Sequence, residues 1–482
     1  MSKRPVAAII LAAGKGTRMK SDLHKVLHPI AGMPMLMHLL ASVDVLAPAH
    51  KVVVVGSGKE QLEAALVGTG CALAVQEPQL GTGHAVQQAQ DALAGFDGDV
   101  LILYGDVPLV SAGTMQRMLD RLNEGDAPPA VVLGFRPDDP GAYGRIVSDD
   151  GRTIAKMVEF KDASEAERKI DLCNSGLMAV RASDLFALLA KVGNDNAAGE
   201  YYLPDIVMVA MKQGKASAVI ETGVDEVTGV NSRAELAAME AKWQARRRQQ
   251  AMDDGATLIA PETVWFAHDT VIGRDVVIEP NVFFGPGVTI ADGVTVHGFS
   301  HIEGATIGVG AQIGPFARLR AGAVLEEKSK VGNFVEMKKA ELGEGSKASH
   351  LTYLGDAKIG KGVNIGAGTI IVNYDGVNKH QTVIEDHAFV GSDTQLIAPV
   401  TIGRGAFIPA GTTVTQNVPA DSLAISRVPQ VNRVGWAAKR RVLLTAGTLS
   451  HDSSKDSSRP RKEKDKKASS NVKKGRAKSS KR

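Results

Sequence analysis

An apolar residue returns at every sixth position through long stretches of the C-terminal half of this chain. A period of six fits neither a helix of 3.6 residues per turn nor the two-residue alternation of a strand. It is typical of a solenoid of short parallel strands, in which the apolar residues stack into one continuous core. The series runs through Ile272, Ile278, Phe284, Ile290, Val296 and Ile302, resumes at Ile307, Ile313, Leu319, Leu325, Val331 and Met337, and continues at Ile359, Ile365, Ile371, Val390, Leu396, Ile402, Ile408 and Val414.

The first 230 residues alternate between apolar runs and helical spacing. Residues 52–55, 101–103 and 131–133 are strand candidates, and residues 36–46, 60–66 and 114–122 have the spacing of helices. This order predicts an α/β domain with a mainly parallel sheet and helices on both faces, with ligands at the carboxyl ends of the strands. Residues 232–251 then read as one long connecting helix, which Ser232 caps and in which Glu235 follows three residues later.

Composition indicates the cellular compartment of the chain and sets its last residues apart from the rest. Two cysteines, Cys71 and Cys173, provide neither a disulfide framework nor a metal-binding spacing, so a reducing cytoplasm is expected. No apolar run is long enough to span a membrane. Residues 451–482 contain 13 basic and 4 acidic residues, a net of +9, and almost nothing apolar. We expect this tail to be disordered; an anionic polymer is a candidate partner, and a solvated extension without a fixed partner is the simpler interpretation.

A glycine-rich loop follows the first apolar run, residues 6–11. The loop, residues 12–19, contains Gly14, Gly16, Lys15 and Arg18, and such a loop presents backbone N–H groups to phosphates. Its glycine spacing is neither that of a P-loop nor that of a dinucleotide-binding fingerprint. Read alone, such a loop is often only a tight turn.

An aspartate stands at the end of the apolar run 101–105. Asp106 is followed by Val107 and Pro108, which places it at the carboxyl end of a buried strand, where Mg²⁺ with few protein ligands leaves room for phosphate oxygens. A helix cap is an equally good interpretation of Asp106 alone. Residues 80–85, Leu-Gly-Thr-Gly-His-Ala, form a second glycine-rich turn before a helix.

The order of these motifs resembles one family. Leu-Ala-Ala-Gly-Lys-Gly-Thr-Arg-Met at 11–19, the turn at 80–85, Tyr-Gly-Asp-Val-Pro-Leu at 104–109, Tyr-Gly-Arg-Ile at 143–146 and Gly-Val-Asn at 229–231 precede the solenoid. The solenoid contributes residues 314–320, 331–339, 350–356, 364–369, 373–376 and 424–429. Together, over residues 5–436, they are similar to the bacterial bifunctional N-acetylglucosamine-1-phosphate uridylyltransferases and glucosamine-1-phosphate acetyltransferases.

The resemblance implies a fold and two reactions. The fold is a Rossmann-like α/β nucleotidyltransferase domain at 1–231, a linker helix at 232–254, a left-handed parallel β-helix of hexapeptide repeats at 255–436, and a C-terminal segment with a basic tail at 437–482. The β-helix acetylates glucosamine 1-phosphate with acetyl-CoA. The α/β domain couples the product, N-acetylglucosamine 1-phosphate, to UTP with release of pyrophosphate, for cell-envelope precursors.

For uridylyl transfer the resemblance implies Mg²⁺ held by Asp106 and Asn231. The acceptor phosphate is already an anion and needs no base, so positioning and charge neutralisation dominate. Arg18 is added on charge grounds as a cation for the triphosphate. The residues expected to bind UTP or the product are Leu11, Ala12, Ala13, Gly14, Arg18, Lys25, Gln76, Gly81, Thr82, Tyr104, Gly105, Asp106, Gly144, Glu159, Asn174 and Asn231, of which Gly144, Glu159 and Asn174 contact the sugar.

For acetyl transfer the resemblance implies His350 as the base, because the attacking amine is largely protonated near neutrality and histidine titrates in that range. Glu336 is a candidate to orient the imidazole. Arg320 and Lys338 are expected to bind the sugar phosphate, and Tyr353 and Asn364 the sugar. The expected acetyl-CoA contacts are Ala367, Asn373, Tyr374, Ser392, Ala410 and Arg427.

Two positions depart from the family pattern, and two rival interpretations remain. Phe160 stands where a histidine commonly follows the sugar-binding glutamate, and Ser175 stands in place of threonine after Asn174. One rival is a nucleotidyltransferase for another sugar whose solenoid only assembles subunits, and the other is a binding scaffold without acetyltransferase activity. The resemblance also implies a homotrimer with acetyl-CoA sites between adjacent solenoids.

Overall fold

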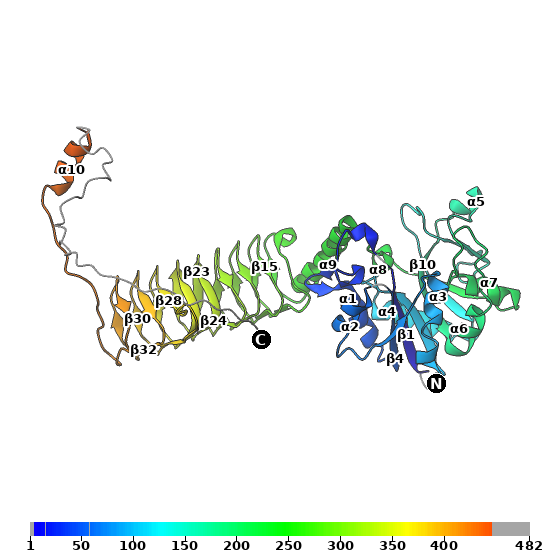
Figure 1. Cartoon of the computed structure of the whole chain (residues 1–482), viewed down its shortest axis with the longest axis horizontal. Coiled ribbons are helices and arrows are strands. Elements are labelled where there is room, and N and C mark those ends of the chain that lie inside the picture. The colour runs from blue at the N-terminus through cyan, green and yellow to red at the C-terminus, as the bar shows by residue number, and fades with distance from the viewer. Residues whose placement is uncertain (1–3, 15, 57, 446–482) are drawn as a thin grey trace, which may run out of the picture. The chain divides into compact units, whose positions relative to one another are not determined.

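The computed structural model describes residues 4–14, 16–56 and 58–445. Contacts divide the chain after Ser426, and the part before this division contains an α/β domain and a β-helix (Figure 1). Lys15 of the glycine-rich loop and the basic tail 451–482 lie outside the described residues. No helix of the described chain is both long and apolar enough to cross a membrane.

One mixed sheet forms the centre of the α/β domain. Its strand order is β11-β7-β10-β6-β1-β4-β5, and β10 alone of these seven runs antiparallel to its neighbours β6 and β7. The prediction of a mainly parallel sheet is therefore confirmed. The strands are β1 (Val6–Ala12), β4 (His50–Val55), β5 (Ala72–Val75), β6 (Asp99–Tyr104), β7 (Ala130–Phe135), β10 (Cys173–Arg181) and β11 (Ala218–Glu221), with β8 (Arg145–Val147) and β9 (Lys156–Val158) at the side of β10.

Helices cover both faces of this sheet, as the alternating pattern predicted, because successive residues of the buried strands point to opposite sides. Ile10 of β1 packs with α1 (Met35–Asp44), α2 (Lys59–Ala65) and α4 (Ala112–Leu122). Ile9 packs on the other side, with α3 (Thr82–Gln87), α6 (Ala182–Leu189) and α7 (Asp205–Lys212). The remaining short elements are β2 (Pro29–Ile30), β3 (Met33–Pro34), α5 (Glu165–Arg168) and α8 (Val224–Val227).

The connecting helix α9 spans Arg233–Asp253, two residues beyond its predicted end. Ser232 caps it as predicted, because its hydroxyl accepts a hydrogen bond from the Glu235 N–H at 3.2 Å. The amide of Gln244 is buried and bonds Phe266 in both directions, donating to its carbonyl at 2.7 Å and accepting from its N–H at 2.9 Å. Glu240 accepts from the Ala31 N–H at 2.7 Å, so α9 is bonded to both neighbouring folds.

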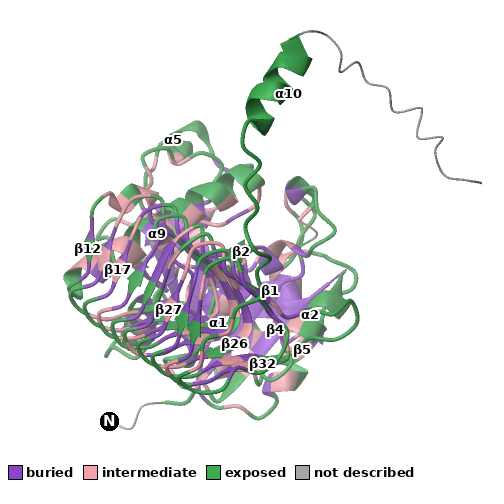
Figure 2. Ribbon diagram, turned by 90° about the vertical axis from the view of Figure 1, so that its left-hand side faces the viewer, coloured by how far each residue is buried: buried purple, intermediate pink, exposed green. Residues whose placement is uncertain are grey.

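The solenoid is a parallel β-helix whose coils repeat in three columns of strands. The inward apolar residues of the coils are buried, as Figure 2 shows by colour. The first column contains β12 (Thr257–Leu258), β14 (Val277–Ile278), β17 (Thr295–Val296), β20 (Gln312–Ile313), β23 (Lys330–Asn333), β25 (Lys347–His350), β27 (Asn364–Ile365), β30 (Phe389–Val390) and β33 (Phe407–Ile408).

The other two columns are joined into one sheet by β24 (Glu336–Leu342) and β26 (Tyr353–Ile359), which run round a corner. The second column contains β13 (Val271–Ile272), β16 (Thr289–Ile290), β19 (Ala305–Ile307), β22 (Ala323–Leu325), β29 (Thr382–Ile384) and β32 (Val400–Ile402). The third contains β15 (Phe283–Phe284), β18 (His301–Ile302), β21 (Arg318–Leu319), β28 (Ile370–Val372), β31 (Gln395–Ile397) and β34 (Thr413–Val414).

The gap in the hexad between Met337 and Ile359 is a change of spacing and not a break in the coil. Leu342, Ala348 and Leu354 occupy the inward positions there and are fully buried. Steps of five residues from Met337 to Leu342 and from Leu354 to Ile359 hide the period from a strict count of six. A true excursion follows at residues 373–380, closed by an isolated bridge between Tyr374 and Lys379.

The part beyond Ser426 contains helix α10, Trp436–Thr445, all of whose residues are exposed (Figure 2). Within it, the Arg440 guanidinium lies 5.3 Å from the centre of the Trp436 ring. Arg427 belongs to this second part of the chain.

Candidate active sites

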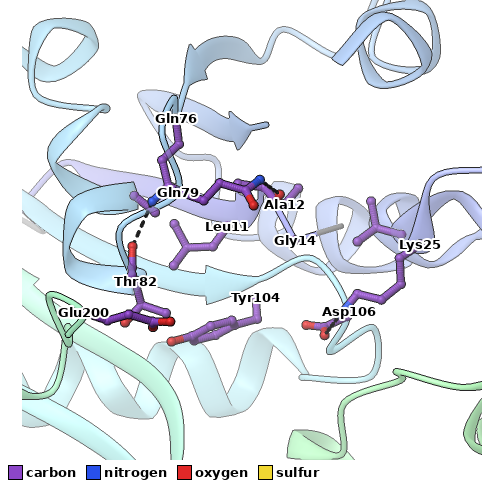
Figure 3. A pocket seen from close by; sticks show the side chains of 14 residues that line it. Leu11, Ala12, Gly14, Lys25, Gln76, Gln79, Thr82, Tyr104, Asp106 and Glu200 are labelled. Carbon is purple, nitrogen blue, oxygen red and sulfur yellow. Dashed lines mark hydrogen bonds and ion pairs between the residues drawn. The ribbon is translucent and has the colours of Figure 1, made fainter. Parts of the chain in front are cut away.

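A cavity of about 400 Å³ opens at the carboxyl ends of β1 and β6 (Figure 3). The Gly105 N–H donates to the Leu11 carbonyl at 2.9 Å, which continues the pairing of the two strands into the loops that follow them. The cavity therefore lies where an α/β sheet presents ligands. Its lining residues are Leu11, Ala12, Ala13, Gly14, Lys25, Val26, Gln76, Gln79, Gly81, Thr82, Ala85, Tyr104, Asp106 and Glu200.

The second glycine-rich turn forms one wall of this cavity. Gly81 has a φ of +111°, and a Cβ there would lie 2.6 Å from the Tyr201 carbonyl oxygen, so the position needs glycine. Gln76 Nε2 donates to the Gly81 carbonyl at 2.9 Å. Thr82 Oγ1 accepts from the Leu203 N–H at 3.0 Å. These contacts bind the turn to residues 201–203 and hold its backbone at the cavity edge.

Three polar side chains from distant parts of the sequence meet at the other end of the cavity. Lys25, in the short 3-10 helix Lys25–Leu27, donates from Nζ to Asp106 Oδ2 and, at 3.2 Å, to Asn231 Oδ1. The Val230 N–H donates to the Asp106 carbonyl at 2.9 Å, which fixes the segment before α9 against the end of β6. Asp106 and Asn231 thus direct two oxygen atoms at one cation.

This pair of oxygen ligands fits a divalent metal. Mg²⁺ takes one or two protein oxygens and completes its shell with water and substrate phosphates. A larger all-protein cage is not needed, and none occurs: the described part of the chain contains no group of three or more His, Cys, Asp or Glu side chains suited to a metal. The interpretation of Asp106 as a helix cap is not supported, since Ser111 caps α4, accepting from the Thr114 N–H at 3.1 Å.

Tyr104 lines this cavity, and a second, smaller cavity lies elsewhere in the α/β domain. Burial, and the nearby Asp106 carboxylate, raise the pKa of the Tyr104 phenol, so it stays a neutral hydrogen-bonding group. Gly176 has a φ of +85°, and a Cβ there would lie 2.7 Å from the Tyr104 ring. The turn at Gly176 therefore allows the close approach of β10 to the ring.

The smaller cavity is formed by β8, β9 and β10 and contains the three residues expected to contact sugar. A Cβ on Gly144 would lie 3.3 Å from both carboxylate oxygens of Glu159, so glycine makes room for that group. Asn174 is bonded through its backbone N–H to the Gly144 carbonyl at 2.9 Å. Burial, followed by the charges of Asp205 and Asp162, raises the pKa of Glu159. The lining is Gly144, Arg145, Met157, Val158, Glu159, Asn174, Pro204 and Asp205.

The two departures from the family pattern lie beside this cavity. Ser175 Oγ donates to the Leu133 carbonyl at 2.6 Å and accepts from the Leu177 N–H at 3.2 Å, so a hydroxyl is fully used there. The Phe160 ring lies under the guanidinium of Arg168, 4.7 Å from its centre. Both residues support the loops around Glu159 and Asn174.

Three observations modify the sequence-based list for the α/β domain. Arg18 is exposed in the 3-10 helix Thr17–Met19 and is not among the residues that line the cavity. Gln79, which was not predicted, donates from Nε2 to the Ala13 carbonyl and ties the two glycine-rich loops together. Glu200, also not predicted, lines the cavity from a segment without a recognisable motif.

The second candidate site lies on three successive coils of the β-helix. Arg320 directly follows β21, whose register with β24 places it beside Lys338. Tyr353 pairs with Glu336 in the next coil, and its ring lies over Gly355, where a Cβ would meet the phenol oxygen at 2.4 Å. Glu336 accepts from Arg320 Nη1 at 2.9 Å.

Lys379 joins these cations from the excursion at 373–380. Its charge, followed by that of Arg320, lowers the pKa of Lys338, which is how cations behave when they are gathered without enough anions. Asp375 shapes the excursion by accepting from the N–H groups of Val377 and Asn378 at 2.8 and 2.6 Å. The sequence pattern did not predict the role of Lys379, because only the folded excursion brings it back to Lys338.

His350 ends β25, one corner away from Tyr353. Its partner is Asn333, whose Oδ1 lies 2.6 Å from the imidazole Nδ1. The expectation that Glu336 orients the imidazole is not supported: among the described residues no hydrogen bond or ion pair joins Glu336 to His350, and the Glu336 carboxylate accepts from Arg320.

Three of the residues expected to bind acetyl-CoA lie in register on the later coils. The Asp393 N–H donates to the Ala367 carbonyl and the Gly411 N–H donates to the Ser392 carbonyl, both at 2.8 Å, so Ala367, Ser392 and Ala410 lie in register on three successive coils. Asn373 is buried and donates to Asp356 Oδ2, and the Tyr374 hydroxyl donates to the Gly376 carbonyl at 2.6 Å. Arg427 lies beyond the division of the chain.

The residues expected to bind the amino sugar are divided between two faces. Asn364 lies on β27 in the first column, where it pairs with Lys347 and Phe389. Tyr353 lies on β26 in the joined sheet. A single β-helix therefore presents Asn364 and Tyr353 on different faces.

Comparisons with known proteins agree with an N-terminal α/β domain followed by a β-helix. A MobA-like NTP transferase domain matches residues 8–166, and bacterial transferase hexapeptide repeats match residues 269–304 and 381–416. Proteins named bifunctional protein GlmU from Sphingopyxis alaskensis and Rhizorhabdus wittichii are each 66% identical to this chain, over 433 and 441 residues. These matches cover 90% and 92% of this chain and 96% and 98% of the relatives. The protein of the same name from Zymomonas mobilis is 59% identical over 440 residues, 91% of this chain and 98% of the relative.

Proposed function

We propose residue roles for the two sites of this chain, which belongs to the family of bifunctional GlmU proteins. The chain is a two-activity transferase of UDP-N-acetylglucosamine synthesis: it acetylates glucosamine 1-phosphate and transfers uridylyl from UTP to N-acetylglucosamine 1-phosphate. We assign the second reaction to residues 1–231 and the first to residues 255–436. Residues 232–254 connect them, and 437–482 form the C-terminal segment.

In our account, UTP occupies the cavity between the two glycine-rich loops. Backbone N–H groups at 11–14 and 81–82 hold the nucleotide, and Gln76 and Lys25 contact base and phosphate. Gly144, Glu159 and Asn174 position the sugar so that its phosphate meets the α-phosphate in line. Asp106 and Asn231 would hold Mg²⁺, which when bound supplies charge neutralisation for the phosphates. The fit of two oxygens around the Lys25 ammonium supports this choice of ligands.

The acetyl transfer is assigned to the β-helix. Arg320 and Lys338, joined by Lys379, bind the phosphate of glucosamine 1-phosphate, Arg320 as a planar fork and the lysines as point charges. Tyr353 and Asn364 bind the sugar, and His350 takes the ammonium proton before the amine attacks the thioester. Ala367, Asn373, Tyr374, Ser392, Ala410 and Arg427 bind acetyl-CoA. The gathering of Arg320, Lys338 and Lys379 is the observation that carries this assignment, because a scaffold has no use for three cations at one place.

The oligomer completes the second site in this account. Tyr353 and Asn364 lie on different faces of one β-helix, and this separation supports our proposal that a neighbouring chain completes the site that uses both. We propose a homotrimer with three such shared sites, working in the cytoplasm on small substrates. We further propose that the basic tail contacts anionic polymers.

The rival in which the solenoid only assembles subunits makes a different prediction for His350. In our account His350→Ala lowers kcat for acetylation by roughly 10²–10⁴-fold, the usual contribution of a general base, and leaves the KM for glucosamine 1-phosphate little changed. Raising the pH partly restores the variant, because free amine then forms without the base. His301→Ala, an exposed histidine elsewhere on the β-helix, is the control. Normal acetylation by the His350 variant would refute the assignment, and absence of acetylation in wild-type enzyme would favour the rival.

A further inference from the structure

Asn333 and His350 are neighbours fixed by the backbone of two consecutive coils. Strands β23 and β25 are paired so that Asn333 lies opposite His350 at the last position of each. The Leu351 N–H donates to the Asn333 carbonyl at 3.0 Å, and Thr352 Oγ1 donates to the His350 carbonyl at 2.7 Å. The two side chains therefore leave rigid backbone in register.

Gly332 brings the two coils unusually close just before this pair. A Cβ at position 332 would lie 1.9 Å from the Ser349 carbonyl oxygen, which no side chain tolerates. The close approach places the amide of Asn333 within hydrogen-bond distance of the imidazole. Glu336, the carboxylate expected from the sequence to orient the imidazole, accepts a hydrogen bond from Arg320 instead.

The direction of this hydrogen bond decides which ring nitrogen can act as a base. A neutral imidazole has one N–H donor and one acceptor, and the partner of the first nitrogen fixes the state of the second. In this orientation of the amide, Asn333 Oδ1 faces Nδ1 and can only accept, which requires the proton on Nδ1 and leaves the lone pair on Nε2. We propose that Asn333 is a positioning residue that holds His350 in the Nδ1–H tautomer, with Nε2 as the base for acetyl transfer.

This proposal rests on the proposed function of His350 as the base for acetyl transfer. It adds a reason why the imidazole has the tautomer that this function needs. In the reaction Nε2 takes one proton from the substrate ammonium, the freed amine nitrogen forms a bond to the acetyl carbon, and the carbon–sulfur bond of acetyl-CoA breaks. The imidazolium returns its proton to the departing thiolate, and the second proton lost by the nitrogen goes to solvent. Because its partner is a neutral amide and not a carboxylate, the ring returns to the neutral state without a fixed counter-charge.

The test uses the full-length enzyme with Asn333→Ala and Asn333→Asp. Asn333→Ala removes the acceptor and is expected to lower kcat for acetylation by about 10- to 100-fold, the effect typical of losing such an orienting partner. The KM for glucosamine 1-phosphate and the uridylyl transfer rate stay near wild type. Asn333→Asp keeps the shape and the acceptor, so it retains kcat at alkaline pH, and the acidic limb of its pH profile moves to higher pH because a carboxylate favours the imidazolium.

Matched controls separate positioning from structure. Asn417 also accepts a hydrogen bond from a neighbouring coil, from the Thr401 N–H of the preceding coil at 2.8 Å, so Asn417→Ala removes a hydrogen bond between coils and should not change kcat. If Asn333→Asp is as slow as Asn333→Ala at every pH, the amide acts as a donor and the proposal is wrong. Wild-type kcat in Asn333→Ala overturns it as well.

A third comparison distinguishes failure of this proposal from failure of the proposed function. In a His350→Ala background, Asn333→Ala should cost nothing further, since it acts only through the imidazole. If His350→Ala acetylates normally, the role of His350 fails. If His350→Ala is impaired and Asn333→Ala is not, only the role of Asn333 fails.

Discussion

The Lys25 ammonium donates to the Asp106 carboxylate and lies 3.2 Å from the Asn231 amide oxygen, so one cation bridges two residues 125 positions apart in sequence. Both side chains of the ion pair are largely buried, at 13% and 17% exposure. The two oxygens are therefore arranged around a positive charge before any substrate binds, and a metal that uses the same oxygens has to displace the ammonium.

Replacement of Lys25 should therefore tighten metal binding while weakening nucleotide binding. We expect Lys25→Gln to bind Mn²⁺ on the order of tenfold more tightly in the absence of nucleotide, which corresponds to about 1.4 kcal/mol, and to raise the KM for UTP. Electron paramagnetic resonance of free Mn²⁺ measures the first effect without relying on activity. Lys51→Gln, which breaks the remote pair of Lys51 with Asp44, is the control. Unchanged or weaker Mn²⁺ binding by Lys25→Gln would show that the ammonium and the metal do not compete.

The half-buried Glu159 carboxylate should reduce stability at neutral pH. Its pKa is raised above the ordinary value of 4.5, so the folded state favours the protonated form and loses stability as the pH rises and the carboxylate ionises. Glu159→Gln should raise the midpoint of thermal unfolding at pH 7.5, and the gain should disappear as the pH falls below 4.5. Differential scanning calorimetry across this range, with the exposed Glu63→Gln as control, measures it. A gain that is independent of pH would show that ionisation of Glu159 is not its cause.

The division of Tyr353 and Asn364 between two faces predicts that acetylation depends on assembly. Sedimentation velocity should give three chains per particle for the wild type. Dilution to a concentration at which the particle dissociates should remove acetyl transfer and leave uridylyl transfer, whose cavity is formed by one chain. A monomer that acetylates glucosamine 1-phosphate would be incompatible with a shared site.

Local patterns predicted the architecture because each repeats a simple physical rule. The hexad identified the β-helix, since the inward positions of the coils are apolar, and the count of six failed where steps of five residues lead to Ile307, Leu342 and Ile359 and at the excursion 373–380. The run at 173–181 was not recognised as a strand antiparallel to its neighbours, because a fully buried strand has the same composition in either direction.

The sites were less predictable because they depend on contacts between distant residues. Asp106 and Asn231 were found through motifs, yet the position of Lys25 between them follows only from the packing of the segment before α9. Asn333 and Glu336 belong to the same motif, and the charged Glu336 was expected from the sequence to orient the His350 imidazole. The register of β23 with β25 decides in favour of the amide.

We infer that one chain carries two independent transfer sites joined by a released intermediate. The most direct test measures UDP-N-acetylglucosamine formed from glucosamine 1-phosphate, acetyl-CoA and UTP by Asp106→Asn, by His350→Ala, and by an equal mixture of the two. We predict that each variant alone is nearly inactive and that the mixture recovers the product, because N-acetylglucosamine 1-phosphate made by the first variant is used by the second. A mixture as inactive as its components, or full activity in either variant alone, would contradict the account.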